Sequence, residues 1–542
     1  MRQGRVIMPA NEQNVSAATP PQGNVQGPRP MAVIDIGTTA VRMDIAEISA
    51  TGDIRSLDSL QRAVNLGRDT FFGGRIRQAT IEECVGILQA YRRVMGEYGI
   101  VSDDQVRAVA TSAIMEADNG DAFLDRIYIT TRINVVPVEE SEVNRLTYVA
   151  LYRLLEKEPY LKEGNALIIE VGGGSTKILL IQDGAVTRSS VFRLGALRMR
   201  ETLEKHRTPA DRIRAVIDAH IERTVEEMKH SIPVETVQNV IAIAGDMRLA
   251  MAKLVPEWKE GETAKLMLGA FTAVEKIAVA PVDELVRKHH IPYHEAETAG
   301  PALLAYTRIA RTFKAKQIVI STLSLREGLL VDEAGGGLWT ESFTGQILNS
   351  ARSLGEKYDY DALHAANVME LALTLFRALQ SEHHMDARLG VLLRVAATLH
   401  EIGLFVNNRS HHKHSMYLIQ NSDVFGLSHE DMLIAALVAR YHRRSTPKPA
   451  HEGFALLDRE GRIAVSKLAA LLRVADALER RQTQRIHDIV LSREGGQLVI
   501  TAPNVEDVTL ERLAMEEKAG MFEDVYGLKV ILRTSMTGGE ES

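Results

Sequence analysis

One unit of sequence occurs twice in the chain, and it constrains the fold more than any other feature. Each copy has an apolar strand with an acidic residue at its end, a short loop of glycine and hydroxyl residues, and a second strand closed by a turn that contains aspartate and glycine. The first copy covers residues 31–53 and contains Asp35 and the loop Gly37-Thr38-Thr39. The second covers residues 166–184 and contains Glu170 and the loop Gly172-Gly173-Gly174-Ser175-Thr176. Two copies of one plan predict two similar α/β lobes that enclose a cleft.

The residue types of these loops suit the binding of phosphate. A glycine turn after a strand lets backbone N–H groups approach a phosphate closely, and hydroxyl groups add further donors. An acidic residue at the strand end can hold Mg2+ or orient a water molecule, so Asp35 and Glu170 are predicted Mg2+ ligands. A single loop of this kind often only connects two strands. Two loops at matching places favour a phosphate chain held between the lobes.

The chain has 542 residues, and changes in composition and in the periodicity of apolar residues divide it into five parts. Residues 1–29 are rich in Pro, Gly, Gln and Asn and are expected to be a disordered extension. Residues 30–150 and 151–340 are expected to form the two lobes. Helical periodicity dominates residues 345–485, which predicts an all-helical domain. Residues 486–542 alternate between strand and helix and predict a small α/β tail.

Composition and charge exclude several classes of function. The net charge of −7 argues against a general nucleic-acid binder, so no specific nucleic-acid partner is expected. Cys84 is the only cysteine, which excludes a disulfide framework and a cysteine-rich zinc site. No apolar run approaches the roughly 20 residues that cross a bilayer, and the N-terminus has no apolar signal core. We therefore expect a cytoplasmic protein with no membrane partner.

Several segments resemble one known family. Residues 32–43 and 169–179 resemble the two phosphate loops of the exopolyphosphatase/guanosine pentaphosphate phosphohydrolase (Ppx/GppA) family, and residues 110–123 and 325–330 resemble its Thr-Ser-Ala and Leu-Arg-Glu-Gly segments. The resemblance implies two actin-like lobes of the ribonuclease H-like class, followed by a helical domain. It implies hydrolysis of terminal phosphoanhydrides of inorganic polyphosphate or guanosine pentaphosphate. The family tends to form homodimers, which the sequence neither supports nor excludes.

The chain departs from this family at active-site positions. Met115 stands where the family has an arginine that contacts phosphate, and Val143 stands where it has the catalytic glutamate. Glu142 is adjacent to Val143, but neighbours on an extended segment face opposite ways, so Glu142 substitutes only if the backbone shifts. Lys177 replaces a glutamate, and this cation could pair with phosphate. Arg42 resembles a basic residue of some members and is also expected to bind phosphate.

These changes leave two interpretations of the amino-terminal half. In the first, it is a phosphohydrolase whose base is Glu142 or Glu170. In the second, it is a sensor that binds polyphosphate or an alarmone nucleotide, because a cleft with more positive charge and fewer bases binds phosphate chains but hydrolyses them slowly. Whether a carboxylate can occupy the place of Val143 distinguishes the two.

Histidines and acidic residues of the helical half form a second pattern. In chain order they are His364, His400-Glu401, His414, His442 and Asp476. The order resembles the HD-domain metal phosphohydrolases, although Glu401 replaces their aspartate. Imidazole and carboxylate groups suit Mn, Fe, Ni or Zn, and a metal-bound water is a good nucleophile. A transition-metal site that catalyses hydrolysis is a third interpretation, and the alternative is a set of buried histidines in an HD-like scaffold. The neighbouring run His411-His412-Lys413 is expected to be a basic surface patch.

Overall fold

The computed structural model contains two compact units, residues 23–338 and residues 339–542, the second together with residues 1–22. Among the described helices, none is both long enough and apolar enough to span a membrane. The structure describes residues 5–7, 28–157, 165–205, 212–232, 237–243, 250, 254–255, 257–258, 263–321, 323–335, 341–443 and 445–535.

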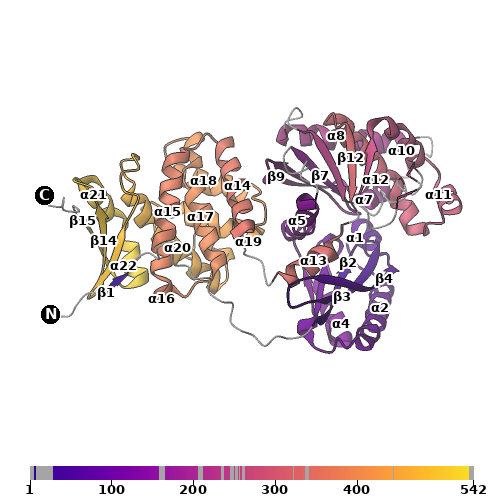
Figure 1. The fold of residues 1–542 in the computed structure, drawn as a ribbon, viewed down its shortest axis with the longest axis horizontal. Coiled ribbons are helices and arrows are strands. Elements are labelled where there is room, and N and C mark those ends of the chain that lie inside the picture. Colours follow the sequence, from indigo (N-terminus) through magenta and orange to yellow (C-terminus); the bar gives the residue numbers. More distant parts are fainter. Residues whose placement is uncertain are drawn as a thin grey trace. The chain divides into compact units, whose positions relative to one another are not determined.

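The first lobe is built on a mixed five-stranded sheet (Figure 1). Its central strand β2 (Arg29–Ile36) pairs antiparallel with β3 (Ala40–Ile48) and parallel with β5 (Val106–Ala110). Outside these strands lie β4 (Ile54–Ala63) and β6 (Val135–Pro137). The hairpin of β2 and β3 therefore carries the first predicted loop, at the end of a strand with a buried centre.

The second lobe repeats this plan on a six-stranded sheet of order β11-β12-β10-β7-β8-β9. Here β7 (Ala166–Val171) pairs antiparallel with β8 (Thr176–Gln182) and parallel with β10 (Asn239–Ile243), as β2 does with β3 and β5. The predicted internal repeat is thus confirmed at the level of strand pairing. The outer strands are β9 (Ala185–Phe192), β11 (Ala264–Met267) and β12 (Gln317–Ser321).

Helices cover both sheets. In the first lobe, α2 (Gln78–Glu97) and α4 (Gly120–Thr131) share a core with Ile34 of β2. In the second lobe, α8 (Ile213–Ser231) and α12 (Tyr293–Thr312) share a core with Ile169 of β7. The other described α-helices of this unit are α1 (Leu66–Gly73), α3 (Ser112–Met115), α5 (Glu140–Lys157), α7 (Ala196–Lys205), α10 (Phe271–Ala278), α11 (Val282–His289) and α13 (Leu325–Ala334).

The helix α13 differs from the expected division of the lobes. Residues 151–340 are expected to form the second lobe, yet Leu329 of α13 belongs to the same core as Met31 and Val33 of the first lobe. Side chains alternate along a strand, so Met31 and Val33 face the side of β2 opposite to Ile34. The helix α5, which crosses the expected boundary at residue 150, covers the same side. The first lobe therefore takes its second helical layer from later parts of the chain.

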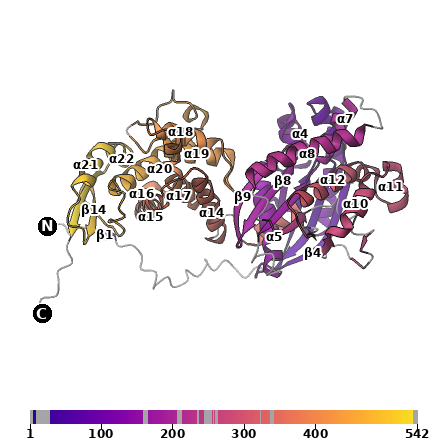
Figure 2. The same cartoon turned by 90° about the horizontal axis from the view of Figure 1, so that it is seen from above.

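The second unit contains a helical domain and a small α/β tail, as the sequence predicts. In the tail, α22 (Gly520–Tyr526) lies between the sheet and α20 (Arg459–Leu478) of the helical domain (Figure 1 and Figure 2). The tail also contains α21 (Thr509–Lys518) and the strands β13 (Val490–Glu494), β14 (Gln497–Pro503) and β15 (Lys529–Ser535). The described α-helices of the helical domain are α14 (Glu341–Lys357), α15 (Ala362–Ala378), α16 (Gln380–His383), α17 (Ala387–Leu399), α18 (His411–Gln420), α19 (His429–Arg440) and α20 (Arg459–Leu478).

Two details of this unit differ from the sequence expectation. A short strand, β1 (Arg5–Ile7), lies within the segment expected to be disordered and pairs antiparallel with β13. Its apolar residues Val6 and Ile7 suit the addition of a strand to a sheet edge. The periodicity of residues 510–526 predicts one helix, but α21 and α22 are separate, and Gly520 at their junction is a poor helix former.

Candidate functional site

A cleft of about 960 Å³ opens in the two-lobed unit where its two glycine loops meet. The loops follow β2 and β7, and residues of α5 and α13 complete the wall. Both predicted Mg2+ ligands, Asp35 and Glu170, line this cleft. So do the predicted phosphate-binding residues other than Thr176, namely Gly37, Thr38, Thr39, Arg42, Gly172, Gly173, Gly174, Ser175 and Lys177.

The two loops contact each other directly. A Cβ atom on Gly173 would lie 2.3 Å from Oγ1 of Thr38, so the approach of the second loop to the first requires glycine. Each loop is also closed internally, since the N–H of Gly37 donates to the carbonyl of Ala40 and the N–H of Gly172 donates to that of Ser175. The loops therefore form one continuous, tightly turned wall of the cleft.

Asp35 has an oxygen atom available for a cation. Its Oδ1 is buried and has no hydrogen-bond partner among the described residues. Its Oδ2 lies 3.7 Å from Nη1 of Arg42, whose Nε donates to Gln61 at 3.2 Å. Arg42 thus lies beside the predicted ligand and brings positive charge to the first loop.

Lys177 links two carboxylates at the second loop. Its Nζ lies 3.3 Å from Oε2 of Glu140 and 3.6 Å from Oε2 of Glu170. Burial alone would lower the pKa of Lys177, but the carboxylates of Glu170 and Glu140 outweigh burial and raise it. The predicted ligand Glu170 is therefore already paired with a cation.

The predicted base Glu142 does not line the cleft in the described structure. Its carboxylate accepts two hydrogen bonds of 2.8 Å from Arg145, which is 2% exposed and also binds Asp332 of α13. Glu140 of the same helix does line the cleft, and it accepts a hydrogen bond of 3.0 Å from Oγ of Ser175. Glu142 is thus placed as a structural partner of Arg145.

The reason is that α5 is a helix where the sequence analysis assumed an extended segment. Residues three apart lie on the same helical face, whereas direct neighbours are about 100° apart. Val143 lines the cleft, and Glu140, one turn earlier, lines it too. Glu140 lies three residues before Val143 in the sequence. Had this segment been treated as a helix, this spacing would have placed Glu140 on the same face as Val143.

Two further residues occupy places outside the cleft. The hydroxyl of Thr176 donates to the backbone carbonyl of Leu194, so this predicted phosphate ligand instead holds the base of the second loop. Met115 is 48% exposed at the end of α3. Nearby positive charge comes from Arg198, which donates to the carbonyl of Gly174 at 2.9 Å and pairs with Glu116 at 2.6 Å.

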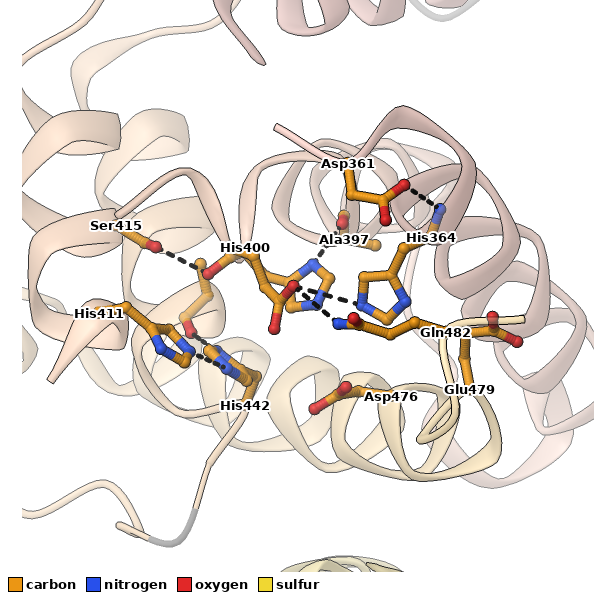
Figure 3. Close-up of polar contacts among 12 residues, drawn as sticks. Asp361, His364, Ala397, His400, His411, Ser415, His442, Asp476, Glu479 and Gln482 are labelled. Carbon is orange, nitrogen blue, oxygen red and sulfur yellow. Dashed lines mark hydrogen bonds and ion pairs between the residues drawn. The ribbon is translucent and has the colours of Figure 1, made fainter. Parts of the chain in front are cut away.

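The helical domain contains a cluster of histidines (Figure 3). The ligand atoms of His364, His400 and Glu401 lie within 4.8 Å of one another, and so do those of Glu401, His411 and His442. Glu401 therefore belongs to both groups. In Figure 3 the ring of His400 lies between that of His364 and those of His411 and His442.

Backbone carbonyls hold three of these rings through Nδ1. His400 contacts the carbonyl of Ala397 at 2.7 Å, and His442 contacts that of Ala439 at 2.6 Å. His411 contacts that of Asn408 at 3.3 Å. Burial lowers the pKa of His400 and, more strongly, that of His442. These contacts fix the ring orientations and direct each Nε2 away from the backbone.

Two predicted ligands lie outside both groups, and one residue of the predicted surface patch is buried within the cluster. His414 is outside both groups, and His411, which was expected at a basic surface, takes part instead. Asp476 is outside them as well, and its carboxylate is ion-paired with Lys518 of α21. Burial alone would raise the pKa of Asp476, but the Lys518 ammonium holds it well below its usual range.

Paired glycine loops at the ends of two equivalent central strands define a two-lobed α/β protein of the actin-like class. An exopolyphosphatase from Cytophaga hutchinsonii has a similar fold, with a TM-score of 0.51 and 19% sequence identity, over 57% of this chain and 99% of that one. The Ppx/GppA phosphatase family matches residues 45–336, and Ppx/GppA phosphatase domain III matches residues 348–513. The chain belongs to the Ppx/GppA phosphatase family.

Curated relatives match most of the chain. The guanosine-5'-triphosphate,3'-diphosphate pyrophosphatase of Aeromonas hydrophila is 24% identical over 483 residues, which cover 87% of this chain and 92% of the relative. The protein of the same name from Vibrio vulnificus is 23% identical over 513 residues, which cover 91% and 96%. The helical domain is accordingly domain III of this family, and its resemblance to HD domains stays a prediction.

Proposed function

We propose that the two-lobed unit hydrolyses the terminal phosphoanhydride of pppGpp or of inorganic polyphosphate. The observation that carries the proposal is the cleft, in which two glycine loops, Asp35, Glu140 and Lys177 line one space. Family membership supports a hydrolase that acts on phosphoanhydrides. The names of the relatives supply the two substrate classes.

Binding of the terminal phosphate falls to the two loops. Their backbone N–H groups and the hydroxyls of Thr38, Thr39 and Ser175 are the donors, and Arg42 and Lys177 add charge. The contact between Thr38 and Gly173 holds the loops at a fixed separation. A phosphoryl group would therefore be positioned without rearrangement of the loops, which favours reaction.

The donor set fits Mg2+. A buried carboxylate oxygen without a described hydrogen-bond partner, Asp35 Oδ1, is the kind of hard ligand that this ion prefers. Asp35 would hold the ion. Glu170 would be the second ligand, with its carboxylate shared between the ion and Lys177. When bound, Mg2+ neutralises charge on the phosphoryl oxygens.

We assign the role of general base to Glu140 in place of Glu142. Its carboxylate reaches the second loop, where it contacts Ser175 and Lys177. As the water oxygen bonds to the terminal phosphorus and the bond to the leaving phosphate oxygen breaks, Glu140 accepts the proton of the water. Lys177 competes with this water for the same carboxylate, which favours slow turnover.

The same Lys177 supports a second candidate function. If its ion pairs with Glu140 and Glu170 persist when a phosphate chain binds, the cleft binds without hydrolysis and the unit acts as a polyphosphate or alarmone sensor. The two candidates differ only in turnover, so a rate measurement separates them.

The test is phosphate release from pppGpp and from long-chain polyphosphate with Mg2+. We expect Glu140→Gln to lower kcat by roughly 100-fold or more, the usual contribution of a general base. Glu142→Gln is the matched control on the same helix, and it should retain most of the activity after a folding check. Loss of turnover only in Glu142→Gln would contradict the assignment. No turnover in the wild type, with tight binding in calorimetry, would favour the sensor.

A further inference from the structure

The histidine cluster of domain III lies outside the cleft and takes no part in the proposed hydrolysis. His364, His400 and His442 are at most 1% exposed. Buried polar atoms normally have a partner. Nε2 of His400 and both ring nitrogens of His364 nevertheless have no hydrogen-bond partner among the described residues. These atoms point to a ligand that the described chain does not supply.

The tautomers of His411 and His442 lead to the same conclusion. Each directs Nδ1 to a backbone carbonyl, which only accepts, so each Nδ1 carries a proton. In a neutral imidazole Nε2 is then an unprotonated acceptor. The two Nε2 atoms lie 3.3 Å apart, so two lone pairs face each other without a donor. A cation between them makes this contact favourable.

The separations suit metal coordination. Around a tetrahedral ion with bonds of about 2.1 Å, neighbouring ligand atoms are roughly 3.4 Å apart. The distance between His411 and His442 is 3.3 Å, and that between Nε2 of His364 and Oε2 of Glu401 is 3.6 Å. Because Glu401 belongs to both groups, its carboxylate can join two ions.

We propose that domain III binds a pair of first-row transition-metal ions bridged by Glu401. His364 and His400 hold one ion, and His411 and His442 hold the other (Figure 3). Two imidazoles and one carboxylate suit Mn, Fe, Co, Ni or Zn better than Mg or Ca. The carbonyl contacts of the rings are the outer hydrogen bonds that usually orient histidine ligands. Three protein ligands per ion leave positions open, as in catalytic metal sites.

The metal content of the full-length chain tests this proposal. The protein is stripped with EDTA, dialysed against Zn2+ or Mn2+ as the sole metal, and analysed by inductively coupled plasma mass spectrometry. We expect two ions per wild-type chain, one in His364→Ala, one in His411→Ala and none in Glu401→Gln. His414→Ala is the matched control, because it changes α18 outside both groups, and it should keep two.

Additional variants and measurements separate loss of a metal ligand from misfolding and from binding in the cleft. Asp35→Asn, in the cleft, should keep both ions, which separates this site from the Mg2+ site of the proposed function. Circular dichroism checks folding, and His364→Gln and His411→Gln replace alanine variants that do not fold. With Mn2+, electron paramagnetic resonance should show an exchange-coupled pair in the wild type and an isolated ion in the His411 variant.

Several results would overturn the proposal. A wild type that binds no ion would mean that only water or a shared proton lies between His411 and His442. A wild type with a single ion, or an uncoupled Mn2+ spectrum, would remove the bridge. Full metal content in both histidine variants would place the ions elsewhere.

Discussion

Lys177 places a positive charge between two carboxylates of the cleft. Its side chain is 12% exposed, and its ammonium pairs with Glu140 and Glu170. Removing one partner of a buried ion pair costs about 3–5 kcal/mol, because the remaining charge is uncompensated. The two carboxylates are 31% and 25% exposed, so water offsets part of that cost.

We predict that Lys177→Met lowers the free energy of unfolding in EDTA by about 1–3 kcal/mol. Mg2+ should recover most of this loss, because a divalent ion can compensate the two carboxylates. Denaturant unfolding with and without Mg2+ measures both effects. Lys177→Arg retains the charge and is the control. Equal losses in the two variants, with no recovery in Mg2+, would show that packing of the side chain rather than its charge is what matters.

At the residue scale, the loops were predictable and their neighbours were not. The glycine, hydroxyl and acidic residues of the loops are contiguous, so Asp35 and Gly173 could be located from local pattern alone. Glu140 required the knowledge that a helix begins there. The sequence predicts His414 as a ligand, whereas the structure places His411 in the cluster. Both are on α18, and only the packing of α18 on its neighbours decides which one faces inward.

The junction between α15 and α17 depends on His383, the last residue of α16. Its Nε2 donates to the carbonyl of Phe376 at 2.8 Å, and its Nδ1 accepts from the N–H of Met385 at 2.9 Å. Both bonds require the neutral ring. Burial lowers the pKa of His383, and nearby Lys467 lowers it further while Glu382 opposes the shift.

We predict that this junction makes the helical domain acid-sensitive. The pKa of His383 is about 6.5 in the unfolded state and lower in the folded state. At a pH between these two pKa values, the unfolded chain therefore binds more protons than the folded chain. The free energy of unfolding therefore falls as the pH drops below about 6.5, by at most about 1.4 kcal/mol per pH unit for this one group. Urea unfolding near neutral pH and near pH 5 measures the loss.

The matched variant is His383→Gln, whose amide can still donate to Phe376 but does not titrate. It should be less stable than the wild type at neutral pH and should lose less on acidification. An unchanged pH dependence in this variant would mean that other histidines of the domain cause the acid sensitivity.

At the scale of elements, helical periodicity predicted that residues 345–485 are helical, because each helix buries an apolar stripe, but it did not give the start of every helix. The same reasoning misplaced α13. Its sequence predicts a helix, but its packing on β2 depends on a sheet formed almost 300 residues earlier in the chain. Local pattern gives the type of an element, whereas the lobe it belongs to follows from contacts distant in sequence.

The whole molecule contains two compact units with different proposed ligands. The two-lobed unit has its cores around β2 and β7, and its proposed ligands are a phosphate chain and Mg2+. The helical unit has its histidine cluster on α15, on α18 and on the residues that follow α17 and α19, and its proposed ligands are transition-metal ions. A ligand that binds only the folded form stabilises the unit that contains its site.

We therefore predict two transitions in differential scanning calorimetry of the full chain, each moved by a different ligand. A ligand at 100 times its Kd contributes about 2.7 kcal/mol, which raises the Tm of a unit of this size by roughly 5–10 °C. Polyphosphate with Mg2+ should raise one transition, and Zn2+ added to the EDTA-treated protein should raise the other. Asp35→Asn should abolish only the first shift, and Glu401→Gln only the second. A single transition that either ligand moves would mean that the two units unfold together, so that a ligand bound in the cleft also stabilises the histidine cluster.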